Sequence, residues 1–241
     1  MSRHELVHTV LLHPDPPYRL DLTVWALRRR RRNAIDRWDG AYVRVLLIDA
    51  LPVEVRVEQV GGMRDPVLRV RATAQRELSE SACDEVRSQV ARLLGVEVDM
   101  GRLYALSDSD PMFGQLKDRF LGMRPPRFPD LFEALANAVA NQQLSLEVGL
   151  TLLNRLTIAF GASAAGGSGL AAFPSAEALV GACPDELRRL GFSANKTDYL
   201  LGIADAVATG VLDEGVLERV GRPEALRQLS ALRGVGRWSA E

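Results

Sequence analysis

The sequence is poor in cysteine and lysine and has no long hydrophobic runs, and each shortage excludes a class of protein. Its two cysteines, Cys83 and Cys183, are far apart and match no metal-ligand spacing, so they build neither a disulfide framework nor an iron–sulfur site. We expect them to be buried thiols in a reducing cytoplasm. No apolar run approaches the ~18–20 residues that a membrane span needs. The N-terminus also lacks the features of a signal peptide.

An excess of positive charge is also missing, because 30 Lys and Arg are balanced by 31 Asp and Glu. DNA-binding proteins often carry a basic excess, so we expect any nucleic-acid site here to depend on local geometry or on charges beyond the end of this chain. The arginine run at residues 28–32 could contact nucleic acid, but a solvated helix end is the favoured interpretation. Only Lys117 and Lys196 are lysines.

The two halves of the chain differ in their hydrophobic period. Alternating Val and Leu predict four strands in the first half, and period-3.6 patterns predict helices at 18–31 and 81–95, which together indicate an antiparallel α+β domain over residues 1–107. The predicted strands are at 7–13, 42–49, 52–60 and 66–74. A proline-punctuated linker follows at 123–129, and we expect residues 108–241 to be an all-α domain. Asp130, Ser145 and Ser193 each precede a helical pattern and are predicted N-caps.

The segment LRGVGRWSAE, residues 232–241, predicts a helix end, a turn with two glycines and the start of another helix. Gly234 can adopt the left-handed conformation that ends the first helix, and Gly236 allows another molecule to approach the backbone. The N–H groups of such a turn lack intrahelical partners and suit a phosphate oxygen. The pattern is typical of a helix-hairpin-helix, which holds DNA by its backbone. A plain connector between helices is the alternative.

Three segments in order, FPDLFEALANAVANQQLSLEVGLTLLNRLTIAFG, LRRLGFSANKTDYLLGIADAVATG and LRGVGRWSAE, resemble the DNA-3-methyladenine glycosylase II branch of the helix-hairpin-helix DNA glycosylases. The resemblance implies a TATA-binding-protein-like N-terminal sheet and a monomer that works on double-stranded DNA in the nucleoid. It also implies hydrolysis of the glycosidic bond of alkylated purines of the 3-methyladenine type, after each is flipped out of the duplex. No organic cofactor or catalytic metal is implied, although the hairpin carbonyls could bind a monovalent cation.

The resemblance assigns roles to particular residues. It places Trp238 in the base pocket, where an aromatic ring favours a cationic base. Branches that also cleave the DNA backbone carry a lysine there, so we expect a monofunctional enzyme. The turn Gln142–Ser145 implies a wedge that fills the gap left by the flipped nucleotide, with Gln143 and Leu144 as candidates. Alternatively, Asn141 and Ser145 only cap their helices.

The remaining DNA contacts implied by the resemblance come from the hairpin and from one lysine. The hairpin residues are Gly234, Val235, Gly236, Arg237 and Ser239. Lys196 is a candidate phosphate contact, with a solvated lysine at a helix start as the alternative.

The sequence departs from the family at its end. The family's catalytic Asp follows the second hairpin helix and would lie beyond Glu241, so we expect a C-terminally truncated glycosylase without a catalytic residue of its own. A non-catalytic helix-hairpin-helix DNA-binding protein is the alternative function, and an unrelated α+β protein with a connector turn is the third.

Overall fold

The computed structural model describes residues 6–27, 33–107, 110–164 and 166–240, so the arginine run at 28–32 and Glu241 lie outside the described residues. The chain divides into two compact units. The sheet unit comprises Met1–Pro129 and Ser163–Leu170, and the helical unit comprises Asp130–Ala162 and Ala171–Glu241. The domain boundary expected between residues 107 and 108 stays a prediction, since compactness alone groups 108–129 with the sheet.

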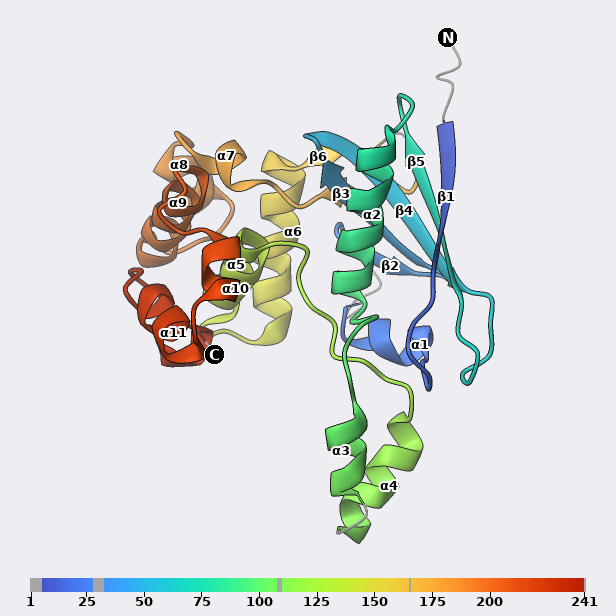
Figure 1. The fold of residues 1–241 in the computed structure, drawn as a ribbon. Helices are drawn as coiled ribbons and strands as arrows, with labels where there is room; N and C mark the ends of the chain where they lie inside the picture. Colours follow the sequence, from blue (N-terminus) through green and yellow to red (C-terminus); the bar gives the residue numbers. More distant parts are fainter. Residues whose placement is uncertain (1–5, 28–32, 108–109, 165, 241) are drawn as a thin grey trace. The chain divides into compact units, whose positions relative to one another are not determined.

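The sheet unit is built on five antiparallel strands in the order β1-β5-β4-β3-β2 (Figure 1). Their bounds are β1 Leu6–Leu12, β2 Asp36–Trp38, β3 Tyr42–Ile48, β4 Leu51–Gln59 and β5 Leu68–Ala74. The four predicted strands are therefore confirmed. Strand β2 was missed because three residues are too short to show a period. Asp49 and Ala50, both at positive φ, make the tight turn between β3 and β4.

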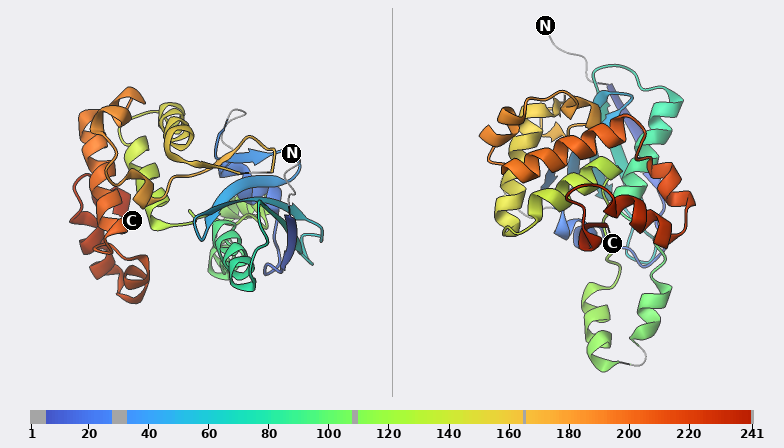
Figure 2. Two further views of the ribbon diagram at one scale, coloured as in Figure 1. Left: turned by 90° about the horizontal axis from the view of Figure 1, so that it is seen from above. Right: turned by 90° about the vertical axis from the view of Figure 1, so that its left-hand side faces the viewer.

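Helix α2, Glu80–Leu93, covers one face of this sheet, as the view from above in Figure 2 shows. Ser79 caps it through a hydrogen bond from the backbone N–H of Ala82, and Val86 and Val90 are fully buried. They pack with alternate residues of β5, whose burial has the period of two expected of a strand with one covered face. Gly95, at φ 59°, ends the helical stretch as predicted.

The long helix expected at 18–31 is shorter in the described residues. It consists of α1, Leu20–Thr23, followed by a single 3₁₀ turn, η1, Val24–Ala26. Two further helices, α3 Gly101–Leu106 and α4 Pro111–Phe120, follow α2 (Figure 1). Asp110 caps α4 as a side-chain acceptor, and Pro111 occupies its first position, where a missing N–H costs nothing.

The helical unit contains α5 to α12 in the described residues. Their bounds are α5 Leu131–Asn141, α6 Leu146–Phe160, α7 Ala176–Leu179, α8 Pro184–Arg189, α9 Ala194–Ala208, α10 Glu214–Arg219, α11 Arg222–Ser230 and α12 Arg237–Ala240. Asp130, Ser145 and Ser193 accept N-terminal backbone N–H groups, so all three predicted caps are confirmed. Two-residue strands, β6 Ala162–Ser163 and β7 Ala171–Ala172, correct the expectation that this half has no strand.

The core of the helical unit forms where α5, α6 and α9 meet. Their inward side chains are almost completely buried, among them Leu135, Val139, Leu153, Leu156, Leu200 and Ile203. Burial of an aliphatic side chain of this size contributes about 1.5–3 kcal/mol. No helix in the described part of the chain is long and apolar enough to cross a membrane. Of the two cysteines, Cys83 is partly buried but Cys183 is exposed, which corrects the expectation for the latter.

Candidate nucleic-acid interface

The predicted hairpin is present in the helical unit as α11, the turn that follows it and α12. Val235 anchors the turn, because its side chain is buried and its N–H donates to the carbonyl of Leu232 at 3.1 Å. Gly234 has φ 88°, and a Cβ atom there would lie 2.2 Å from the ring of Tyr199. Gly236 differs, since a Cβ atom there would meet nothing within 4 Å. One glycine therefore closes the turn against α9, and the other leaves the backbone open.

The open backbone carries donors that a phosphate could use. Gly236 accepts from the N–H groups of Ser239 and Ala240 at 2.9 and 3.0 Å, which starts α12. Within the described residues, the N–H groups of Gly234, Gly236 and Trp238 have no acceptor. Unpaired N–H groups at a turn favour an anionic oxygen.

The predicted wedge lies between α5 and α6. Gln143 is exposed with φ 55°, a left-handed conformation that non-glycine residues seldom adopt. Leu144 is 40% exposed although it is apolar. Ser145 caps α6 by accepting from the N–H of Val148 at 3.4 Å. Asn141 makes no cap, since its Nδ2 donates to the Asn137 carbonyl within α5.

The structure brings three segments that are distant in sequence around one cavity of about 500 Å³. The segments are the turn after α5, the start of α9 and the hairpin. The residues that line the cavity are Gln142, Gln143, Ser193, Asn195, Lys196, Tyr199, Ser230, Leu232, Gly234, Val235 and Gly236. Six of the predicted site residues are therefore neighbours in space, and the sequence alone had not indicated that Tyr199 and Asn195 would join them.

The side chain of Gln142 points to the hairpin. Its Nε2 donates to the Gly234 carbonyl at 2.7 Å and to Ser239 Oγ at 3.2 Å. Both amide hydrogens are thus used inside the protein. Contact of Gln142 with DNA stays a prediction.

Lys196 lies much nearer the hairpin than its sequence position suggests, since it lines the same cavity. Its Nζ donates to the carbonyls of Val139, Ala140 and Gln142, each at 2.8 Å. Burial lowers the pKa of Lys196, whereas three carbonyl acceptors favour its charged form. The alternative of a solvated lysine is therefore wrong, and the geometry gives the ammonium a partner other than phosphate.

Trp238 and Arg237 extend from the first turn of α12 into solvent. Trp238 is 93% exposed and does not line the cavity. A base pocket around this indole stays a prediction, and so does DNA contact by Arg237.

The described residues that line the cavity offer binding groups but no carboxylate or imidazole. No group of three or more His, Cys, Asp and Glu in the described ranges could hold a metal ion. A monovalent cation at the hairpin carbonyls stays a prediction, and the Gly234 carbonyl already accepts from Gln142.

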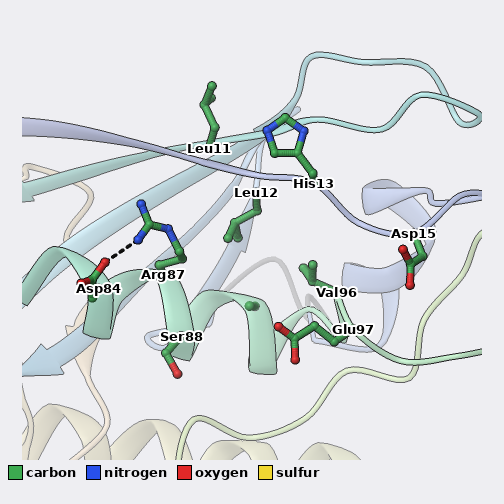
Figure 3. Close-up of a pocket in the computed structure, with 10 residues that line it drawn as sticks. Leu11, Leu12, His13, Asp15, Asp84, Arg87, Ser88, Val96 and Glu97 are labelled. Carbon is green, nitrogen blue, oxygen red and sulfur yellow. Dashed lines mark hydrogen bonds and ion pairs between the residues drawn. The ribbon is translucent and has the colours of Figure 1, made fainter.

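A second cavity, of about 490 Å³, lies in the sheet unit between the end of β1 and α2 (Figure 3). Asp84 and Arg87 pair within it, while Asp15 and Glu97 add further negative charge. Carboxylates repel the phosphates of DNA, so this cavity is a poor nucleic-acid site. None of the predicted site residues lines it.

A glycine turn between two helices with open N–H donors, beside a turn that exposes an apolar side chain, has the geometry of a helix-hairpin-helix. Residues 136–239 match the model of the family described as HhH-GPD superfamily base excision DNA repair protein. The match falls largely on the helical unit.

Curated relatives agree with this assignment. The chain is 29% identical over 158 residues to a DNA-3-methyladenine glycosylase of Bacillus subtilis, covering 65% of this chain and 52% of that protein. It is 27% identical over 145 residues to DNA-3-methyladenine glycosylase 2 of Escherichia coli, covering 58% and 51%. The chain thus spans about half the length of these relatives.

A solved structure confirms the α+β fold. The 3-methyladenine DNA-glycosylase from Archaeoglobus fulgidus superposes with a TM-score of 0.80 at 24% identity, covering 96% of this chain and 77% of that one.

Proposed function

We propose that this chain forms the DNA-binding part of a monofunctional DNA glycosylase that removes alkylated purines of the 3-methyladenine type in base-excision repair. The observation that carries the proposal is the cavity in which the turn after α5 and the hairpin meet. The turn after α5 would bind by inserting a side chain into the base stack. The hairpin would bind a phosphate by its main-chain N–H donors. A protein with a net charge of −1 needs such local donors to bind DNA.

The binding step follows from these groups. The N–H groups at Gly234, Gly236 and Trp238 hold one phosphate of double-stranded DNA. Gln143 and Leu144 then enter the base stack and fill the space left by the flipped nucleotide. The exposed indole of Trp238 offers a face to a cationic alkylated base, which a neutral base would bind less well. The protein acts as a monomer on the chromosomal DNA of the cytoplasm.

The chemical class of the reaction follows from which nucleophiles are near. Cleavage of the DNA backbone needs a free amine, and Lys196 presents an ammonium with every N–H engaged. Hydrolysis of the glycosidic bond of an alkylated purine needs no amine nucleophile, because the cationic base is already a good leaving group. A carboxylate that stabilises the sugar cation is not among the residues lining the described cavity.

The test is release of 3-methyladenine from methylated duplex DNA by the full-length gene product, with unmethylated duplex as the control. We expect free 3-methyladenine and intact DNA strands before alkali treatment. Binding of the duplex without release of base would instead support the non-catalytic DNA-binding alternative. If the protein neither binds duplex nor releases base, the proposal fails.

A further inference from the structure

The last turn of α5 ends in carbonyl groups without the full set of helical N–H donors, although the Val139 carbonyl accepts from the N–H of Gln142 at 3.3 Å. Lys196, in the first turn of α9, supplies further donors from another part of the chain. Its Nζ lies 2.8 Å from each of the carbonyls of Val139, Ala140 and Gln142. A lysine ammonium has three N–H donors, so all three are used on the end of one helix.

The residue that leaves this helix end is held from its other side as well. The carbonyl of Gln142 accepts from Lys196, and its side-chain amide donates to Gly234 and Ser239 of the hairpin. Its backbone and its side chain are therefore attached to two different elements, α9 and the hairpin.

The next residue shows why this support matters. Gln143 takes a left-handed backbone conformation at φ 55°. A non-glycine residue keeps such a conformation only where its surroundings determine it fully. Leu144 follows directly and extends into solvent. The N–H of Leu144 donates to the Asn141 carbonyl at 3.4 Å, so the turn is held on α5 directly before and after the attached Gln142.

We propose that Lys196 and Gln142 are positioning residues that hold the Gln143–Leu144 turn in fixed register with the hairpin, so that phosphate binding and insertion into the base stack occur together. The proposal rests on the proposed function and deepens it. Neither side chain needs to touch DNA. A turn held in place before binding loses less conformational freedom on insertion than a loose one.

A direct phosphate contact by Lys196 makes a different prediction. Loss of a phosphate contact weakens binding to every duplex alike and lowers the slope of log affinity against log salt by about 0.9. Loss of a positioning contact leaves plain duplex and its salt slope unchanged, and weakens only the complex in which the wedge is inserted. The two roles can therefore be separated by measuring both duplexes.

The experiment compares two duplexes, one plain and one with a tetrahydrofuran abasic site beside 2-aminopurine. Fluorescence anisotropy gives the affinity for each, and 2-aminopurine emission reports whether the neighbouring base is unstacked. The variants are Lys196→Met, Lys196→Arg and Gln142→Ala. Lys117→Met, which changes the other lysine of the chain, is the matched control on α4. Circular dichroism checks that each variant is folded.

We expect Lys196→Met to bind plain duplex within about threefold of wild type, and to lose about tenfold in affinity for the abasic duplex, since small misplacements of a positioned group carry large costs. Its 2-aminopurine signal should fall in parallel. Lys196→Arg should recover part of both, because it keeps the charge but fits three convergent carbonyls less well. Gln142→Ala should repeat the pattern without removing a charge, and therefore serves if Lys196→Met does not fold. Lys117→Met should match wild type.

Two outcomes would overturn the positioning role. In one, Lys196→Met weakens both duplexes equally and lowers the salt slope, as a phosphate contact requires. In the other, Lys196→Met and Gln142→Ala both keep the full 2-aminopurine signal. If the wild-type chain binds neither duplex, the proposed function itself is wrong, which is a separate result.

Discussion

The two glycines of the hairpin should respond in opposite ways to the same substitution. Gly234→Ala adds a Cβ atom 2.2 Å from the Tyr199 ring at a backbone φ of 88°. The left-handed backbone costs an L-residue about 1–2 kcal/mol, and overpacking costs about 1–3 kcal/mol. We therefore expect the free energy of unfolding to fall by about 2–5 kcal/mol.

Gly236→Ala is the matched control for stability and the test case for binding. Its Cβ atom would meet nothing within 4 Å, and its φ is not in the left-handed region. Alanine at a compatible position leaves stability unchanged or raises it by about 0.4–1 kcal/mol, because the unfolded chain is restricted. If a phosphate approaches this backbone, the same methyl group should nevertheless weaken binding of duplex DNA.

Urea unfolding followed by far-ultraviolet circular dichroism measures the first effect, and anisotropy with labelled duplex measures the second. In a Tyr199→Ala background the ring is absent, so adding Gly234→Ala should lower the unfolding free energy only by the cost of the left-handed backbone. The part of the loss that comes from overpacking should disappear. The reasoning is refuted if Gly234→Ala unfolds at the same urea concentration as wild type. It is equally refuted for the phosphate site if Gly236→Ala binds duplex as wild type does.

Three further outcomes follow from single groups. Borohydride with abasic duplex should trap no covalent adduct, because Lys196 has no free electron pair while all three N–H groups donate; an adduct lost in Lys196→Met would contradict this. Trp238→Ala should leave the unfolding midpoint unchanged, since the ring is 93% exposed, but should reduce the preference for methylated over plain duplex; equal preference in both proteins would remove the base-pocket role. A hydrogen bond from Arg69 and the charge of Arg71 lower the pKa of Glu58, so this carboxylate stabilises the sheet unit at neutral pH. Glu58→Gln should therefore lower the unfolding free energy by at most about 1 kcal/mol at pH 7. The difference in unfolding free energy between the two proteins should disappear as the pH falls below the ordinary pKa of a glutamate, about 4, and Glu58 becomes protonated.

The sequence predicted those elements whose signals are local. Alternation over seven residues gave β5, and the serine that caps α9 marked its start. The short elements carried no such signal. Strand β2 has three residues, and it is a strand because its residues pair with Tyr42, Val43 and Arg44 of β3. These partners lie only 4 to 8 residues away in sequence, but three residues are too few to show an alternating pattern.

The candidate site divides in the same way. Both glycines of the hairpin could be found, because the conformation of a turn is decided by its own residues. The contacts of Lys196 could not, since its acceptors are 54 to 57 residues away. Lysine is usually exposed in folded proteins. The partial burial of Lys196 depends on how α5 and α9 pack, and hence on the core of the helical unit.

This difference bears on how the interface works. Elements that touch DNA must be exposed, and in the proposed interface they include a left-handed glutamine, an apolar leucine and open N–H groups, all of which cost stability in the free protein. Such a surface persists only if residues behind it fix its geometry. Lys196 and Gln142 are placed to do so, one on the backbone of the turn and the other between the turn and the hairpin. The exposed residues are then free to be selected for DNA, while the rigidity of the site depends on contacts that DNA does not reach.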